Sequence, residues 1–294
     1  PVGATEKMAA WLAEDRPDLT FPQTHGFESD IRVAHCPERV LPGHVVRELV
    51  ANDRVIGGMT EKCSEAAIEL YNIFVEGECF VTNARTAEMA KLTENASRDV
   101  NIAFANELSI ICDKLDINVW ELIELANRHP RVNILQPGPG VGGHCIAVDP
   151  WFIVSKNPAE AKLIQTARTV NDSKPEWVVK KVREAVNLHP KKSVKNILCL
   201  GLSFKPDIDD LRESPAKRIV EALVMDRMGD IVIVEPNIDI LPNSLRDNAV
   251  LNDLESGLQD ADVIVVLVKH KIFEENLIAL KSSQVLIDVC GLTR

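Results

Sequence analysis

The chain has 294 residues, more than one ordinary core holds, and this length suits two domains, or two and part of a third. With 46% hydrophobic and 26% charged residues, it contains no apolar run near the roughly 18 residues of a membrane span and no signal-peptide pattern. We therefore expect a cytosolic protein. The net charge of -11 disfavours nucleic acid and anionic membranes as partners, and seven cysteines without a CxxC pair disfavour a disulfide framework or a metal site.

The first part of the chain predicts the tail of an α/β domain. Short β-rich runs at 31–34, 54–58 and 79–82 alternate with weak helical stretches. Residues 1–5 have turn chemistry and lead straight into a helix with no strand before it. We therefore expect the chain to begin inside a domain.

A long helix is predicted over residues 86–115, an unbroken helical pattern without Pro or Gly. At about 1.5 Å per residue this helix is roughly 45 Å long, enough to bridge two domains and still offer a face to a second subunit. Shorter helices are expected at 120–127 and 160–188, with a Pro/Gly-rich loop at 136–143 between them.

The last third, after a linker at 189–192, predicts a βαβ alternation, with strands at 196–202, 231–234, 263–268 and 285–289. A helix is expected at 215–228, with Ser214 as N-cap, Pro215 in the first turn and Gly229 as its C-terminal stop. Strands this apolar are buried on both faces, as in a parallel sheet covered by helices.

The predicted fold class is therefore α/β, in three parts. A partial N-terminal Rossmann domain occupies residues 1–83, and a central helical dimerisation region with the long helix occupies 84–190. A C-terminal Rossmann-like domain with a parallel sheet follows at 191–294.

The segment 138–145 formally matches the dinucleotide-binding pattern GxGxxG. That fingerprint needs a hydrophobic strand directly before it, whereas here Pro137 and Pro139 interrupt the approach and helices are predicted on both sides. The glycines are better suited to bringing the backbone close to a ligand and holding Cys145 on a tight loop.

Cys145 is the candidate nucleophile. A cysteine thiolate can attack an aldehyde and hold the product as a thioester, which splits a four-electron oxidation into two hydride steps. The alternative is a small buried apolar residue, the commoner role of a lone cysteine. A position in a glycine-rich loop, beside His144 and four residues before Asp149, favours the reactive role.

Lys91, Asn95 and Arg98 share one face of the long helix. This face is either a solvated stripe, with Glu94 pairing Arg98, or the wall of a cleft. In a cleft, Lys91 and Asn95 can donate hydrogen bonds to a developing oxyanion.

Two further places combine charge with a strand end or a helix start. Glu38 follows a short β-rich run, where an active-site carboxylate and an ordinary surface glutamate are both possible. The loop 203–214 carries Lys205 and Arg212 just before a helix N-terminus, a place that favours phosphate. With Gly201 alone at its turn, this loop suits a nucleoside diphosphate better than a dinucleotide pyrophosphate.

Five segments in order resemble the UDP-glucose/GDP-mannose dehydrogenase family along nearly the whole chain: residues 1–3, 36–43, 87–95, 142–150 and 204–214. The resemblance implies an N-terminal Rossmann domain for NAD, a central helix on which two subunits pair, and a C-terminal domain for the UDP part of a UDP-sugar substrate.

The resemblance also implies residue roles. Cys145 would be the nucleophile, Lys91 and Asn95 would stabilise oxyanions, and Asp149 and Glu38 would act in proton transfer and water activation. Arg131 would reach a neighbouring subunit's substrate. Substrate contacts would come from Gly142, Phe204 and Lys205, and Arg212 would bind the cofactor NAD.

The sequence at 37–43 and 129–134 resembles the branch that acts on N-acetylated UDP-sugars, in which Arg39, Val40, Arg98 and His129 also face the substrate. Pro42 and Val148 differ from the residues of the UDP-glucose branch, and both differences support the N-acetylated branch. The implied reaction is oxidation of UDP-N-acetyl-D-mannosamine at C6 to the uronate with two NAD. The alternatives are UDP-N-acetylglucosamine as substrate, a catalytically silent UDP-sugar-binding dimer, and an NAD-independent cysteine hydrolase.

The family's first glycine-rich strand-turn-helix and its ribose-binding acid are not found in this sequence. We therefore expect the N-terminal NAD-binding part to be missing, and the chain alone to hold NAD poorly and to be inactive.

Overall fold

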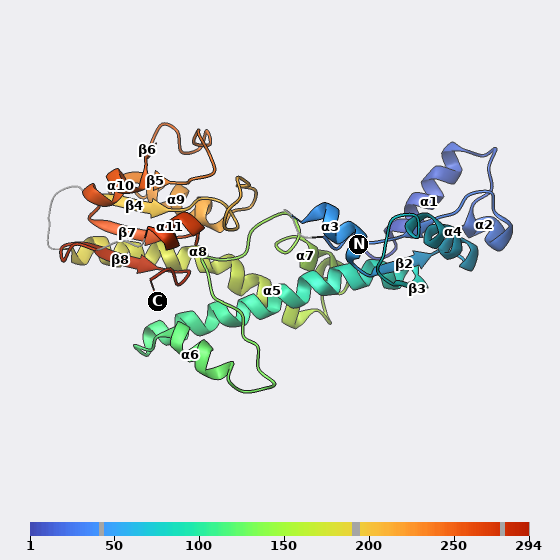
Figure 1. The fold of residues 1–294 in the computed structure, drawn as a ribbon, viewed down its shortest axis with the longest axis horizontal. Coiled ribbons are helices and arrows are strands. Elements are labelled where there is room, and N and C mark those ends of the chain that lie inside the picture. Colours follow the sequence, from blue (N-terminus) through green and yellow to red (C-terminus); the bar gives the residue numbers. More distant parts are fainter. Residues whose placement is uncertain (41–43, 190–194, 277–279, 294) are drawn as a thin grey trace. The chain divides into compact units, whose positions relative to one another are not determined.

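The computed structural model describes residues 1–40, 44–189, 195–276 and 280–293, and Figure 1 traces them. The chain divides into two compact units, Pro1–Asn95 and Ala96–Arg294. Pro42 and residues 190–192 of the expected linker lie outside the described residues. Among the described helices, none combines the length and the hydropathy that crossing a bilayer requires.

The first unit alternates helices with short strands. Its elements are α1 (Ala4–Asp15), α2 (Pro22–His25), the 3-10 helix η1 (Gly26–Glu28), β1 (Ala34–His35), α3 (Val45–Ala51), β2 (Arg54–Gly58), α4 (Glu61–Tyr71), β3 (Cys79–Asn83) and the start of α5 (Ala84–Lys114). β2 pairs with β3 in parallel and with β1 in antiparallel fashion. The predicted strands at 54–58 and 79–82 are confirmed.

The run at 31–34 forms less strand than the sequence indicates. Only Ala34 pairs with β2 in that run, while the N–H of Ile31 donates to the carbonyl of Thr20 at 3.1 Å in a loop. Gly57 has a clear steric role, because a Cβ there would lie 2.5 Å from the Cβ of Ala87. Strand β2 can therefore approach the start of α5 only without a side chain at this position.

The second unit contains the rest of α5, the helices α6 to α8 and a five-stranded sheet with the helices α9 to α11 between its strands. The helices are α6 (Val119–Ala126), α7 (Asp149–Lys156) and α8 (Lys162–Leu188), and the sheet region follows as β4 (Asn196–Leu200), α9 (Pro215–Met225), β5 (Asp230–Val234), β6 (Ala249–Leu251), α10 (Leu254–Asp260), β7 (Val263–Val266), α11 (Lys271–Glu275) and β8 (Val285–Asp288).

The sheet of the second unit has the order β6-β5-β4-β7-β8 with every pair parallel (Figure 1). Ile197 and Cys199 of β4 pack with α8 and α9, whereas Leu198 and Leu200 on the other side pack with Phe273 of α11. The sheet is therefore buried on both faces, which confirms the predicted parallel sheet covered by helices.

The predicted C-terminal stop of α9 is wrong. The helix ends at Met225, and Arg227 adopts the left-handed conformation with φ 50° in place of the expected Gly229. Gly229 has a different task, since a Cβ there would lie 2.2 Å from the carbonyl oxygen of Lys195. The short elements α7, β6, α10 and α11 were not expected from the sequence, because none is long enough to show a period.

Candidate active site

Cys145 lies in the turn that leads into α7, with its side chain half-buried. Its carbonyl oxygen accepts hydrogen bonds from the N–H groups of Val148 at 3.0 Å and Asp149 at 2.8 Å. Asp149 is the first residue of α7, where the helix dipole favours a carboxylate. The thiol is thus held by backbone bonds on a tight turn at a helix start.

The glycines before Cys145 lie against Phe204. A Cβ on Gly142 would be 2.8 Å from the Cβ of Phe204, and one on Gly143 would be 2.9 Å from the phenyl ring. Gly143 also has φ +82°, and its N–H donates to the carbonyl of Arg212 at 3.2 Å. Both positions therefore require glycine, and the cysteine loop packs directly on the loop that carries Phe204 and Arg212.

A buried polar network, not anticipated from the sequence, supports the start of the same loop. The N–H of Gly138 donates to Asn106 at 2.9 Å, and Asn106 donates to Asn171 at 2.9 Å. Asn171 and Arg168 both donate to Asp99 Oδ1, at 2.8 and 2.7 Å. Burial raises the pKa of Asp99, although Arg168 acts in the opposite direction. The sequence signal that could have predicted this network is the presence of Arg168 and Asn171 among the apolar positions of α8.

The loop 201–214 positions the predicted nucleotide contacts. The N–H of Phe204 donates to the carbonyl of Asp210 at 3.1 Å. Ser214 closes the loop, because its hydroxyl donates to the carbonyl of Leu202 at 2.6 Å and accepts from the N–H of Lys217, which confirms it as the N-cap of α9. The Lys205 ammonium forms no ion pair with any residue that the structure describes.

Arg212 lines a groove of about 640 Å³ together with His144, Val148 and Lys217. Its guanidinium is exposed and pairs with Asp210 at 2.6 Å. The hydrogen bond from Arg212 lowers the pKa of the Asp210 carboxyl. Beside the cysteine loop, the groove thus carries two cationic side chains, Arg212 and Lys217, together with three carboxylates, Asp209, Asp210 and Glu213.

Two predicted residues of the first unit, Glu38 and Arg39, form ion pairs within that unit. Glu38 accepts two hydrogen bonds from the buried Arg54, at 3.0 and 3.1 Å, and Arg39 pairs with Glu94 of α5 at 2.8 Å. The alternative pairing of Glu94 with Arg98 is therefore wrong. Lys91, one turn before Glu94 on α5, is half-buried, as are Asn95 and Val40.

Arg98, His129 and Arg131 are exposed in the second unit. His129 and Arg131 follow α6, and the Arg131 N–H lies 3.4 Å from His129 Nδ1. Within the described part of the chain, no hydrogen bond or ion pair joins these three side chains to the cysteine loop.

Family profiles match almost the whole chain. The NAD binding domain of the UDP-glucose/GDP-mannose dehydrogenase family matches residues 1–75, the central domain matches 85–173 and the UDP binding domain matches 198–294. The prediction that the NAD-binding part is missing is therefore wrong. The glycine-rich turn and the acid on which that prediction depended are not the whole signature of the domain.

Relatives agree with these profiles. The UDP-N-acetyl-D-mannosamine dehydrogenase of Campylobacter jejuni is 67% identical over 94% of this chain and 67% of its own length. The NDP-N-acetyl-D-galactosaminuronic acid dehydrogenase of Ralstonia nicotianae is 62% identical over 99% and 68%. This chain thus spans about two thirds of the length of these relatives.

A solved structure matches as well. That of the UDP-D-ManNAc dehydrogenase from Pyrococcus horikoshii aligns with a TM-score of 0.84 and 38% identity, covering 100% of this chain and 68% of that one. The chain therefore belongs to the UDP-glucose/GDP-mannose dehydrogenase family, NAD-dependent oxidoreductases that act on nucleotide sugars.

Proposed function

We propose that this chain carries the catalytic cysteine and the nucleotide site of an enzyme that oxidises UDP-N-acetyl-D-mannosamine at C6 to the uronate. The observation that carries the proposal is the seat of Cys145, on a glycine turn packed against Phe204 and beside Arg212. This arrangement would bring a nucleophile, a nucleotide contact and the guanidinium of Arg212 into one region.

The proposed chemistry has two oxidations. The substrate's C6 alcohol first loses a hydride and a proton to give an aldehyde. The Cys145 thiolate then adds to C6, a second hydride leaves, and the resulting thioester is hydrolysed by water, which releases the carboxylate and restores the thiol. Two NAD are reduced for each uronate formed.

Four further side chains are proposed to support these steps. Lys91 and Asn95 are proposed to donate hydrogen bonds to the oxyanion that forms when sulfur adds to C6. Asp149 and Glu38 are proposed to move protons and to activate the hydrolytic water, with the ion pair to Arg54 orienting Glu38.

Binding would be divided between other residues. Phe204 and Lys205 would hold the nucleotide sugar, with Gly142 close to it. Further sugar contacts are proposed for Arg39, Val40, Arg98 and His129.

NAD, when bound, supplies the hydride acceptor. Arg212, whose exposed guanidinium borders the groove beside the cysteine loop, is proposed to bind and orient the cofactor. Asp210 would hold the guanidinium in place through its hydrogen bonds.

A Cys145→Ala variant tests the role of the thiol. We expect NADH formation from UDP-N-acetyl-D-mannosamine to fall by on the order of 10³-fold or more, because the second oxidation has no covalent route. Cys79→Ala, a change at another half-buried cysteine, is the matched control and should retain turnover. Full turnover by Cys145→Ala would refute the mechanism.

The sugar is tested by comparing kcat/KM for UDP-N-acetyl-D-mannosamine, UDP-N-acetylglucosamine and UDP-N-acetylgalactosamine. The second sugar differs at C2, and the third is included because the relative from Ralstonia nicotianae is named for a galactosaminuronic acid. The proposal predicts the highest value for the mannosamine sugar. A higher value for either competitor would change the substrate but not the chemistry.

A homodimer is also proposed, through the central helices. Four apolar side chains are 44 to 63% exposed and would be covered by a second copy: Phe104 and Ile111 on α5, Leu115 directly after α5, and Leu125 on α6. Sedimentation should give a dimer for the native chain and a monomer for Leu125→Asp. Arg131 would then reach the neighbouring subunit's substrate.

The alternative of a silent UDP-sugar-binding dimer can be tested against the enzyme. Calorimetry distinguishes the two. The enzyme predicts binding of both UDP-sugar and NAD, whereas the silent dimer predicts binding of the UDP-sugar alone.

A further inference from the structure

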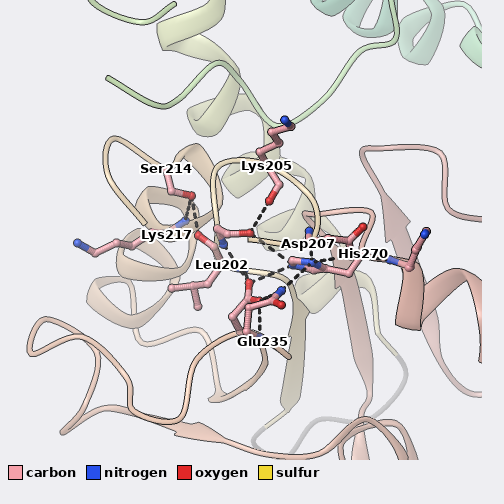
Figure 2. Close-up of polar contacts among 10 residues, drawn as sticks. Leu202, Lys205, Asp207, Ser214, Lys217, Glu235 and His270 are labelled. Carbon is pink, nitrogen blue, oxygen red and sulfur yellow. Dashed lines mark hydrogen bonds and ion pairs between the residues drawn. The ribbon is translucent and has the colours of Figure 1, made fainter. Parts of the chain in front are cut away.

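Two ionisable side chains lie fully buried at the carboxyl edge of the sheet in the second unit (Figure 2). Glu235 directly follows β5, and His270 follows β7 by four residues. Both side chains are 0% exposed, and His270 Nε2 lies 3.1 Å from Glu235 Oε2. A buried carboxylate is costly unless its oxygens are bonded, so the partners of this pair indicate its task.

Glu235 holds the start of the loop 201–214. Its Oε2 accepts from the N–H of Leu202 at 2.7 Å and of Ser203 at 3.0 Å, in addition to His270. Burial acts to raise the pKa of the Glu235 carboxyl, but the hydrogen bonds from His270 and these two amides outweigh it and lower the pKa. The carboxylate thus fixes the chain directly before Phe204.

His270 holds the same loop on the far side of Lys205. The N–H of Asp207 donates to His270 Nδ1 at 2.9 Å, so this nitrogen carries no proton, and the proton on Nε2 faces Glu235. Asp207 has φ 60°, an uncommon conformation for a residue with a side chain, and it accepts from the Lys271 N–H at 3.0 Å.

The residues between these two anchors are Phe204, Lys205 and Pro206. In Figure 2 the Lys205 ammonium points away from the buried pair, whereas its carbonyl oxygen faces it and accepts from the Ser203 hydroxyl at 2.8 Å. The pair therefore fixes the backbone on both sides of Lys205 without touching the ammonium. Carboxyl ends of parallel strands are the edge where α/β folds bind ligands.

We propose that Glu235 and His270 are positioning residues for nucleotide-sugar binding, which act through the backbone of Phe204 and Lys205. This inference rests on the proposed role of Phe204 and Lys205 in holding the nucleotide. Losing a single hydrogen bond that anchors the binding loop should weaken binding by about threefold to tenfold.

Two substitutions of His270 separate its hydrogen bond with Asp207 from its hydrogen bond with Glu235. In His270→Asn the amide oxygen replaces Nδ1, so the bond from Asp207 is kept and Glu235 still holds residues 202–203. In His270→Gln the amide nitrogen replaces Nε2, so the bond to Glu235 is kept and the Asp207 anchor is lost. Calorimetry with UDP as probe should give near-native affinity for His270→Asn and a Kd raised about threefold to tenfold for His270→Gln.

A double-mutant cycle distinguishes positioning from general destabilisation. Since His270 is proposed to act partly through Lys205, His270→Gln should cause a smaller loss of UDP affinity in a Lys205→Ala background than in the native chain. Asp262→Asn is the matched control, because Asp262 is a buried carboxylate at the opposite edge of the same sheet and accepts from the Asn196 N–H at 3.1 Å. It should lower the melting temperature and leave the UDP affinity unchanged.

The outcomes are separable. Native UDP affinity in His270→Gln, or the same loss repeated in the Lys205→Ala background, would overturn the positioning role. Native affinity in Lys205→Ala would instead overturn the proposed function of that lysine. If His270→Gln does not fold, Ser203→Ala serves in its place, since it removes the bond to the Lys205 carbonyl and should raise the UDP Kd about threefold.

Discussion

Two loops of the second unit carry proposed site residues, and they are held in opposite ways. The loop with Cys145 requires glycines, because its backbone lies so close to Phe204 that no side chain fits between them. The loop with Lys205 depends on buried side chains, the carboxylate of Glu235 and the imidazole of His270. Adding one methyl group should therefore disturb the Cys145 loop, whereas removing one hydrogen bond should disturb the Lys205 loop.

The largest expected effect concerns the buried ion pair between Arg168 and Asp99, which belongs to the polar network at the start of the cysteine loop. Arg168→Met leaves Asp99 buried without its cation, so the free energy of unfolding should fall by about 3–5 kcal/mol. Urea denaturation measures this. Arg183→Met on the same helix removes a largely exposed pair with Asp226 and should cost less than about 1 kcal/mol. Equal losses in both variants would contradict the assignment.

A buried charge that touches neither loop sharpens the comparison. Lys174 donates to Ser109 at 2.5 Å and lies 3.7 Å from the ring centroid of Trp177, and burial lowers its pKa from 10.5 to about 7. The unfolded chain binds the Lys174 proton more tightly than the folded chain. The free energy of unfolding should therefore rise with pH between about 7 and 10.5, and below about 7 it should stay at its lower value.

Lys174→Met should remove that pH slope and raise the free energy of unfolding at neutral pH by up to about 4 kcal/mol. Urea denaturation at several pH values is the measurement. Lys181→Met, on the same helix and paired with Asp113 near the surface, should keep the slope. A native slope in Lys174→Met would show that another group titrates.

The glycine support is tested by Gly143→Ala. A methyl group at φ +82° would meet the Phe204 ring at 2.9 Å, so we expect a loss of about 1–3 kcal/mol in the free energy of unfolding. Gly138→Ala is the control, because a Cβ there would meet no other part of the described chain within 4 Å. Similar losses at both positions would mean that the contact with Phe204 has no special part.

The smallest expected effect concerns the end of the Lys205 loop. Ser214→Ala removes the N-cap of α9 and the bond to Leu202, at a cost of about 1 kcal/mol and with weaker UDP binding. Asp253→Ala removes the N-cap of α10 at a similar cost and should leave UDP binding unchanged. A loss of UDP affinity in Asp253→Ala would contradict this distinction.

The sequence predicted the long helix, the two strands at 54–58 and 79–82 and the parallel sheet, because their patterns are long or strongly apolar. It also predicted the Ser214 cap. It did not predict the Glu235–His270 pair, although both residues follow apolar strands, because polar partners distant in the chain have no periodic signal. The same reason hid Asp99 and Arg168.

Phe204 has two roles, one in supporting the cysteine loop and one proposed in nucleotide binding. Its ring is the surface on which the glycine turn before the thiol rests, and it is also a proposed contact of the nucleotide. A change of Phe204 made to alter base or sugar preference would therefore shift the sulfur as well, so affinity and reactivity are expected to change together.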